Sequence, residues 1–416
     1  MLRRTGLGLL LAAVVALFPA ASRSHQASTI AIPSNWLSYG HDAGLTNAVP
    51  VPSLTLAATR RLATVWTKQL DGSIVASPLY ANGTLYVETE AGTVYALQPG
   101  NGAVRWQRTF PVTATPSCGS WGFSSTGAID LKRQLLYVIS ADGFLHALNL
   151  ATGAERAGWP VGITNAHADG EYVWGGLRLF GNTVYVPVAS YCDLPGSDGV
   201  MPNGRLVGVD VVKAAVAETF DPVPGEGNLG GIWGWGGVSI DSTRKRLFTG
   251  VGNSYVYDAS CSCYTDTAGL GDAMVKLTPQ LRVVGWDRPM HYPGTGDYDL
   301  GTAPLLFQPP GCPPLLAGNS KLGWMYVWNR THLKSGLRFS AGVSDGLAAF
   351  VGQPSYSPSL NMIFESHATI TRKKQKVGDG ITAFSIDRRC RFHRRWTTSI
   401  GLGEEPPPLV LGDVVF

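Results

Sequence analysis

The chain has 416 residues, of which only 15% are Asp, Glu, Lys or Arg, and its formal net charge is +4. So small a charge argues against a nucleic-acid-binding protein, and the two dense basic runs at residues 373–376 and 388–395 are interpreted as solvated loops rather than a nucleic-acid or anionic-lipid surface. The 51 glycines and 12 tryptophans, without any long helical pattern, fit a single globular body.

The N-terminus has the pattern of a secretory signal peptide, assigned to residues 1–27. Two arginines precede an apolar run over residues 7–18, and small residues follow it. The run is too short for a stable membrane anchor, although a retained N-terminal anchor is the alternative interpretation. We therefore expect an exported protein, secreted or otherwise extracytoplasmic, whose residues 28–416 form one domain with no integral membrane span.

A whole supersecondary unit occurs twice, at residues 85–106 and 136–159. Each copy alternates apolar residues with the period of half-buried strands, and a glycine, Gly92 or Gly143, supplies the turn between them. A first strand is predicted at residues 74–79, upstream of the first copy, and the tryptophan that closes each copy begins a fourth strand. Because one such sheet cannot bury both of its faces, the copies must stack on each other.

Weaker copies follow along the chain. The predicted strand pairs join residues 184–186 with 204–210, 247–251 with 273–277, 315–316 with 324–328, and 362–365 with 381–386. These repeats predict an all-β fold, a β-propeller of seven or eight four-stranded antiparallel blades whose last blade is incomplete. A β-sandwich or a pair of barrels is the alternative, but the repeat spacing of about 40 to 50 residues favours a propeller.

The end of the chain resembles the beginning of a blade. Residues 407–416 match residues 77–86, which lead into the first clean copy. Two interpretations stay open: the N-terminal segment near Trp36 completes the ring, or the chain is a fragment of a longer one.

Six cysteines fit an oxidising compartment. They are Cys118, Cys192, Cys261, Cys263, Cys312 and Cys390. Three disulfides are possible, in about 15 connectivities. No CxxC pair occurs, which disfavours a zinc site, and no CxxCH occurs for a covalently attached haem. Any redox chemistry would therefore need a separate electron acceptor.

The repeated phrase resembles the GxVYALxxxTGxxxW repeat of quinoprotein propellers, and residues 36–42 (WLSYGHD) resemble the segment that leads into their first blade. That family includes alcohol dehydrogenases dependent on pyrroloquinoline quinone (PQQ) and polyvinyl alcohol dehydrogenases. Non-enzymatic outer-membrane assembly lipoproteins share the repeat, so it predicts the fold more strongly than the activity.

Residues 230–241 and 247–253 are similar to the family's cofactor segment. The resemblance implies that Trp235, with Trp233 as the near alternative, stacks on the flat quinone and that Asn253 is a ligand of Ca²⁺. An aromatic face suits a planar cofactor, and an amide oxygen is a hard ligand suited to calcium. Packing of the tryptophans between blades is the competing interpretation.

Two acidic stretches extend the resemblance. Asp193 is the carboxylate nearest to the place where family members carry a calcium-ligating Glu, although an insertion intervenes. The stretch 294–299 is similar to the family's WDYD segment, which implies that Asp297, with Asp299 behind it, is the catalytic base beside the calcium. Gly296 replaces the tryptophan of that segment, so an ordinary Gly- and Asp-rich turn is the alternative.

Lys321 lies in a stretch that resembles the family's N-K-x-G turn, which implies a cation that hydrogen-bonds the quinone oxygens. Two departures oppose the resemblance. The two adjacent cysteines that cover the cofactor in the alcohol dehydrogenases are absent, and residues 119–127 contain no basic residue where an Arg is expected.

Two functions therefore remain. The first is an exported dehydrogenase that oxidises an alcohol, small or polymeric, by hydride transfer to PQQ with the help of Ca²⁺. The second is a propeller that binds or scaffolds a partner and whose quinone site has lapsed. A hydrolase is disfavoured because no GxSxG motif occurs.

Overall fold

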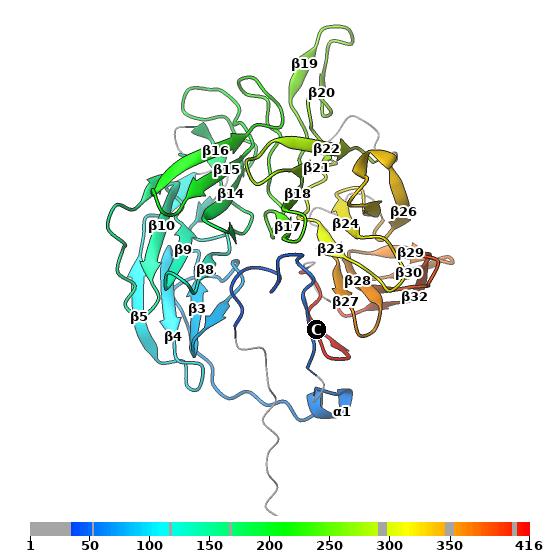
Figure 1. Ribbon diagram of the computed structural model, residues 1–416, viewed down its shortest axis with the longest axis horizontal. Coiled ribbons are helices and arrows are strands. Elements are labelled where there is room, and N and C mark those ends of the chain that lie inside the picture. The colour runs from blue at the N-terminus through cyan, green and yellow to red at the C-terminus, as the bar shows by residue number, and fades with distance from the viewer. Residues whose placement is uncertain are drawn as a thin grey trace, which may run out of the picture.

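The computed structural model describes residues 35–51, 54–115, 119–165, 169–289, 298–345, 353–401 and 406–416. Within them, six antiparallel sheets follow one another along the chain and are arranged around a common axis (Figure 1). Each sheet has the four-stranded order of a propeller blade, which confirms the predicted fold class.

The blades are formed as follows. Blade 1 contains β2 (Leu79–Ala81), β3 (Thr84–Glu88), β4 (Thr93–Leu97) and β5 (Val104–Thr109). Blade 2 contains β8 (Ala128–Asp130), β9 (Leu135–Ile139), β10 (Phe144–Asn149) and β11 (Val161–Gly162). Blade 3 contains β13 (Arg178–Phe180), β14 (Thr183–Ser190), β15 (Arg205–Asp210) and β16 (Ala215–Phe220), and β12 (Glu171–Tyr172) pairs with the far end of β14.

The second half of the ring repeats this plan. Blade 4 contains β17 (Ser239–Asp241), β18 (Arg246–Gly250), β21 (Met274–Leu277) and β22 (Val283–Asp287). Blade 5 contains β23 (Leu305–Phe307), β24 (Leu315–Ser320), β25 (Trp324–Asn329) and β26 (Leu337–Gly342). Blade 6 contains β27 (Ser355–Ser357), β28 (Met362–His367), β31 (Gly380–Ile386) and β32 (Phe392–Ser399).

Short elements lie outside the blades. They are helix α1 (Leu56–Thr59), the 3₁₀ turn η1 (Leu333–Ser335) and three hairpins: β6 (Thr113–Thr115) with β7 (Gly119–Trp121), β19 (Val256–Asp258) with β20 (Cys263–Thr265), and β29 (Ile370–Arg372) with β30 (Gln375–Val377). The hairpins β19–β20 and β29–β30 are insertions between the second and third strands of blades 4 and 6.

The predicted strand pairs occur in register. The turn glycines have the left-handed backbone that the sequence required, with φ of 80° at Gly92 and 86° at Gly143. At Gly143 a Cβ atom would also lie 1.8 Å from the carbonyl oxygen of Thr164, so that only glycine fits. The first strand of blade 1 begins at Leu79, later than predicted, and Ile74 is instead 49% exposed.

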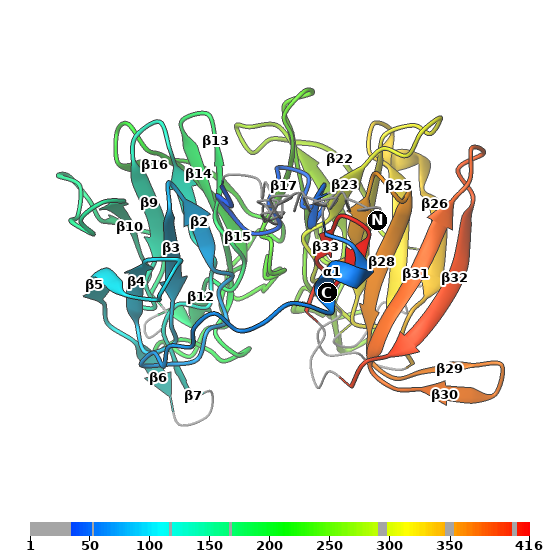
Figure 2. The same cartoon turned by 90° about the horizontal axis from the view of Figure 1, so that it is seen from below.

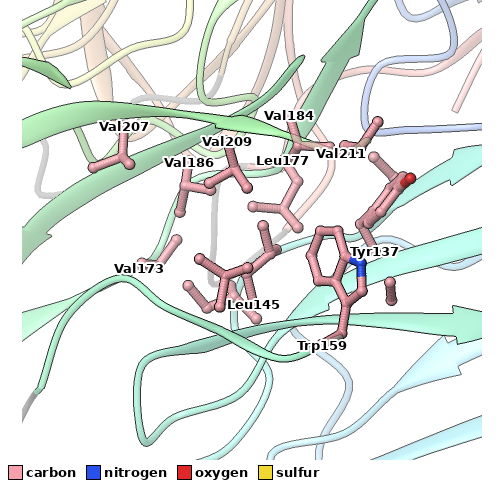
Figure 3. Close-up of a cluster of buried hydrophobic side chains, with 14 of the residues drawn as sticks. Tyr137, Leu145, Trp159, Val173, Leu177, Val184, Val186, Val207, Val209 and Val211 are labelled. Atoms are coloured by element: carbon pink, nitrogen blue, oxygen red, sulfur yellow. The ribbon is translucent and has the colours of Figure 1, made fainter. Parts of the chain in front are cut away.

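Apolar faces of neighbouring blades form the core. Figure 3 shows the cluster between blades 2 and 3, in which small branched side chains of blade 3 pack against larger ones of blade 2. Val184, Val186 and Val209 are fully buried there, beside Tyr137 and Leu145. Fully burying a side chain of this kind stabilises the fold by roughly 1.5–3 kcal/mol.

The axial segment, residues 36–47, runs past the first strand of every blade. Its backbone pairs with Tyr80 at the centre of β2. The central residues of four later first strands donate their N–H groups to its carbonyl oxygens: Ile129 to Leu37, Ile240 to Ala43, Leu306 to Gly44 and Tyr356 to Thr46, at 2.7–3.0 Å. In blade 3 a side chain replaces the backbone, since the Arg178 guanidinium donates to the carbonyl oxygens of Tyr39 and Asp42, each at 2.7 Å. One segment thus contacts all six blades at the axis.

A seventh, smaller sheet joins the two ends of the described chain. β1 (Ala48–Val49) pairs in parallel with β33 (Val410–Leu411), which pairs with β34 (Val414–Val415), and the sheet contacts β27 of blade 6. β33 and β34 lie within residues 407–416, where the resemblance to residues 77–86 predicts strands. Figure 2 shows this sheet beside blade 6.

Two disulfides have both of their cysteines among the described residues. Cys312–Cys390 connects a loop of blade 5 to a loop of blade 6, and Cys261–Cys263 lies in the β19–β20 hairpin. Cys192 is also disulfide-bonded. In the described part of the chain, no helix has the length and apolar character needed to cross a membrane.

Candidate active site

Several of the predicted site residues that the structure describes lie at one end of the ring because of blade topology. In every blade, the segment that enters the first strand and the segment that leaves the second strand lie at the same end. Trp233 and Trp235 precede β17, and Asn253 follows β18. Asp299 precedes β23 and Lys321 follows β24, so blades 4 and 5 present these residues side by side.

Asp299 is the centre of this group. Its Oδ2 atom lies 2.7 Å from the Lys321 ammonium, and its Oδ1 atom accepts a hydrogen bond of 2.5 Å from the backbone N–H of Asn253. Both side chains of the ion pair are removed from water, at 5% exposure for Asp299 and 15% for Lys321. The carboxylate therefore joins three stretches that are far apart in the sequence.

Trp233 packs between blades 4 and 5. The Lys321 ammonium lies 5.1 Å from the centre of its ring, within the range of a cation–π contact. Gly301 touches the ring so closely that a Cβ atom would lie 1.7 Å from Cζ2 of Trp233. Trp233 therefore positions Lys321 and fills the space between the blades.

Trp235 lies at the axis of the ring. It is half-buried and packs against Tyr39 and Leu45 of the axial segment and against Ala303 of blade 5. Its carbonyl oxygen accepts a hydrogen bond from Gly176 N–H, which connects it to blade 3. Trp235 therefore contacts the axial segment, whereas Trp233 packs against Gly301 and Lys321.

Of the two predicted carboxylate ligands, the structure describes only Asp193, which follows the second strand of blade 3. Asp193 is exposed and hydrogen-bonded to the Ser190 hydroxyl, with a left-handed backbone at φ 51°. Asp297 lies outside the described residues. Among the described residues there is no group of three or more His, Cys, Asp or Glu side chains arranged to hold a metal ion.

Sequence reasoning missed a buried polar group in blades 5 and 6. Asn319 donates a 2.7 Å hydrogen bond to Glu365, and both side chains are 1% exposed or less. His367, on the same strand as Glu365, is also fully buried, and its Nδ1 lies 2.5 Å from the Ala368 carbonyl oxygen. The position of Asn319, two residues before Lys321, was the signal that could have revealed this group.

Blades 1 to 3 contribute a second missed group at the same end. Glu90 accepts hydrogen bonds from Gly122 N–H at 2.6 Å and from the Ser124 hydroxyl at 2.8 Å, and burial raises the pKa of its carboxyl group. The Tyr172 hydroxyl donates to the Gly122 carbonyl oxygen at 2.8 Å, and its ring contacts Trp174. No motif in the sequence pointed to this arrangement.

Known proteins that are similar to this chain carry the same kind of repeat. Residues 57–186 match the family described as outer membrane protein assembly factor BamB. The chain is 24% identical over 254 residues to the quinohemoprotein alcohol dehydrogenase ADH-IIG of Pseudomonas putida, covering 54% of this chain and 34% of the relative. It is 25% identical over 309 residues to a polyvinylalcohol dehydrogenase of a Pseudomonas species, covering 67% of this chain and 46% of the relative.

The fold of a solved structure is also similar. A europium-containing methanol dehydrogenase superimposes with a TM-score of 0.68 at 16% identity, covering 92% of this chain and 81% of that chain. The chain is therefore similar in its repeat to the PQQ-type propellers and similar in fold to a quinoprotein dehydrogenase. The matches to the two curated relatives span less than half of each relative's length.

Proposed function

We propose that this PQQ-type propeller is an exported quinoprotein dehydrogenase that oxidises an alcohol, with PQQ and Ca²⁺ bound at the axial end of blades 4 and 5. The contact of Asp299 with both Lys321 and Asn253 carries the proposal, because it unites three stretches that resemble the family's cofactor segments. A small alcohol and a polymeric alcohol are both candidate substrates. A separate electron acceptor would reoxidise the cofactor.

The residues present fit a planar quinone on one side. Trp235 is a partly buried aromatic side chain beside the axial segment, and Lys321 is a cation that can hydrogen-bond a quinone oxygen. When bound, PQQ would supply the acceptor for the hydride of the alcohol carbon. The ion pair with Asp299 and the contact with Trp233 hold the Lys321 ammonium in place for this role.

The oxygen-bearing side chains suit a hard cation. We assign the Asn253 amide oxygen, Asp297 and Asp193 as candidate Ca²⁺ ligands, since calcium prefers carboxylate and amide oxygens. Asp297 would also accept the hydroxyl proton of the alcohol as hydride leaves. Asp299, which follows Asp297 by two residues in the same stretch and is ion-paired with Lys321, is the second candidate for this proton.

A binding module with a lapsed quinone site is the alternative. The observation that favours it is the Lys321–Asp299 pair itself, because the two buried charges already compensate each other without a ligand. The missing cysteine pair, and the absence of a basic residue from residues 119–127, also remove half of the cofactor clamp that the family resemblance implies.

Reconstitution distinguishes the two functions. The full chain would be titrated with PQQ in the presence and absence of Ca²⁺ while tryptophan fluorescence is recorded, and then assayed for alcohol-dependent dye reduction. We expect quenching of the tryptophan fluorescence and turnover of at least one alcohol. Absence of both quenching and turnover would favour the binding module.

Variants test the residue assignments. Asn253→Ala and Asp297→Ala should each lower turnover by at least about 100-fold, as loss of a metal ligand or base does. A further variant, Lys321→Met, removes the cation of the candidate site. Its control is Lys245→Met, a substitution at an exposed residue of blade 4. Unchanged turnover in Asn253→Ala and Asp297→Ala would show that the site is assigned incorrectly.

A further inference from the structure

The β19–β20 hairpin projects outward from blade 4 at the edge of the ring (Figure 1). It begins three residues after Asn253, so the polypeptide leads directly from the candidate active site into the hairpin. Ser254 secures its base: the Ser254 N–H donates to the Asp266 carbonyl oxygen at 2.8 Å, and its hydroxyl donates to the Thr265 carbonyl oxygen at 2.6 Å.

One face of the hairpin carries three tyrosines. Tyr257 and Tyr264 are direct cross-strand partners, and Tyr255 is two residues before Tyr257 and therefore on the same face. The rings of Tyr255 and Tyr264 are stacked, with centroids 4.0 Å apart and planes inclined by 5°. Tyr257 meets Tyr264 edge to face at 5.6 Å.

This tyrosine face is open to solvent. Tyr255, Tyr257 and Tyr264 are 39%, 56% and 48% exposed, although each ring is large enough to be a substantial part of a core. Cross-strand stacking alone would stabilise the hairpin but would not require all three rings to remain exposed. Exposed aromatic side chains gathered on one face are typical of binding surfaces.

The face is also rigid before any ligand arrives. The Cys261–Cys263 disulfide closes the tip of the hairpin, next to the Asp258–Cys263 pair of the two strands. The stacked rings restrict the side chains themselves. A surface that is already ordered loses little conformational entropy on binding, which increases affinity.

Charge limits the class of ligand. No Lys or Arg occurs between residues 247 and 275, and Arg288 donates to the carbonyl oxygens of Thr267, Gly269 and Gly271 after the hairpin, so the hairpin itself carries no cation to pair with phosphate, sulfate or carboxylate groups. Aromatic ring faces combined with phenolic hydroxyls match a ligand that alternates apolar C–H faces with hydroxyl groups, as pyranose rings do. We infer that the tyrosine face binds a neutral polysaccharide chain. This inference does not depend on bound PQQ.

Affinity gel electrophoresis of the full chain tests the inference. The gels would contain hydroxyethylcellulose, amylose or galactomannan, with dextran sulfate as the anionic comparison. We expect at least one neutral polymer to retard the protein and Tyr257→Ala to weaken that retardation roughly five- to tenfold, the loss of one aromatic contact. Trp286→Ala, which removes an exposed aromatic side chain elsewhere in blade 4, should leave it unchanged.

A second variant guards against misfolding of the hairpin. Tyr264→Phe keeps the stacked ring and removes only a hydroxyl group, so it should fold normally and weaken binding less than Tyr257→Ala. Retardation by none of the neutral polymers, or equal retardation of wild type and Tyr257→Ala, would overturn the inference. A change of oligomeric state in Tyr257→Ala during sedimentation would also overturn it, because the face would then be a contact between copies of the chain.

The polysaccharide-binding proposal and the proposed dehydrogenase function can each fail without the other. Polysaccharide binding without any quinone-dependent turnover would leave the tyrosine face correct and the dehydrogenase proposal wrong. Turnover of a small alcohol without polysaccharide binding would give the opposite conclusion.

Discussion

The Lys321 ammonium lies 2.7 Å from the Asp299 carboxylate and 5.1 Å from the centre of the Trp233 ring. This one cation therefore connects β24 of blade 5 to a carboxylate that precedes β23 and to a tryptophan of blade 4. Both side chains of the pair are mostly buried. Removing one of them would therefore leave the charge of the other without a partner in a poorly solvated environment.

Lys321→Met should destabilise the protein by about 3–5 kcal/mol, the cost of leaving a buried charge without its partner. The double variant Lys321→Met, Asp299→Asn should recover most of that loss. Urea unfolding at neutral pH measures both values, with the exposed Lys245→Met as the control. Equal stability of Lys321→Met and wild type would show that the pair does not stabilise the site end.

Arg178→Ala should destabilise the ring through the axial segment. The fully buried guanidinium donates to Ser38 Oγ at 2.8 Å and to two carbonyl oxygens of that segment, and burial lowers its pKa to about 10. Loss of these charged hydrogen bonds should cost at least about 3 kcal/mol. Denaturant unfolding would show the loss, and limited proteolysis should cut residues 36–47 faster. Exposed Arg282→Ala should change neither readout.

Stability should fall as the pH rises from about 5 to 8. Burial raises the pKa of Glu88 from 4.5 to about 8, so in this window the folded state holds a proton that the unfolded state has released. The Glu88 contribution is therefore fully present below the unfolded pKa and is lost as pH approaches the folded pKa. The free energy of unfolding should decrease by up to about 1.4 kcal/mol per pH unit.

Glu88→Gln tests this assignment, because glutamine cannot ionise. Its free energy of unfolding, measured by denaturant titration at several pH values, should vary less between pH 5 and 8 than that of wild type. Glu218→Gln changes an exposed carboxylate and should retain the wild-type slope. If the free energy of unfolding varied with pH equally in Glu88→Gln and in wild type, Glu88 would be ionised in the folded state.

Gly301→Ala should disturb Trp233 directly, since the new Cβ atom would lie 1.7 Å from its ring. The backbone or the ring must move, and overpacking of this kind costs about 1–3 kcal/mol or more. Thermal unfolding and tryptophan fluorescence would reveal both the loss of stability and the displaced ring. At Gly100 a Cβ atom meets nothing within 4 Å, so Gly100→Ala serves as the matched control.

Much of the fold could be predicted because the signals are local. The alternation of apolar residues around Gly92 and Gly143 depends only on strand geometry and on a backbone that glycine adopts without strain. Repetition of that unit then requires stacking, since each sheet has two faces to bury. The start of β2 was misplaced because Ile74 is apolar but exposed, and an apolar residue alone does not show whether it is buried.

The candidate site was predictable only in part. The stretches around Trp233, Asn253 and Lys321 could be recognised in the sequence, but their mutual contacts depend on which loops meet at the end of the ring. Sequence resemblance placed Asp297 first, and this residue lies outside the described part of the chain. Asp299 is the carboxylate that the described structure brings to Lys321.

The sequence by itself determined the blade unit, the strand pairs and the turn glycines, because these follow from short-range periodicity and backbone sterics. Tertiary structure decided what lies at the axis. The hydrogen bonds between the axial segment and successive blades join residues as far apart as Thr46 and Tyr356. Trp235 packs against Tyr39 of the same segment. Such contacts exist only after the ring has assembled, so no local pattern specifies them.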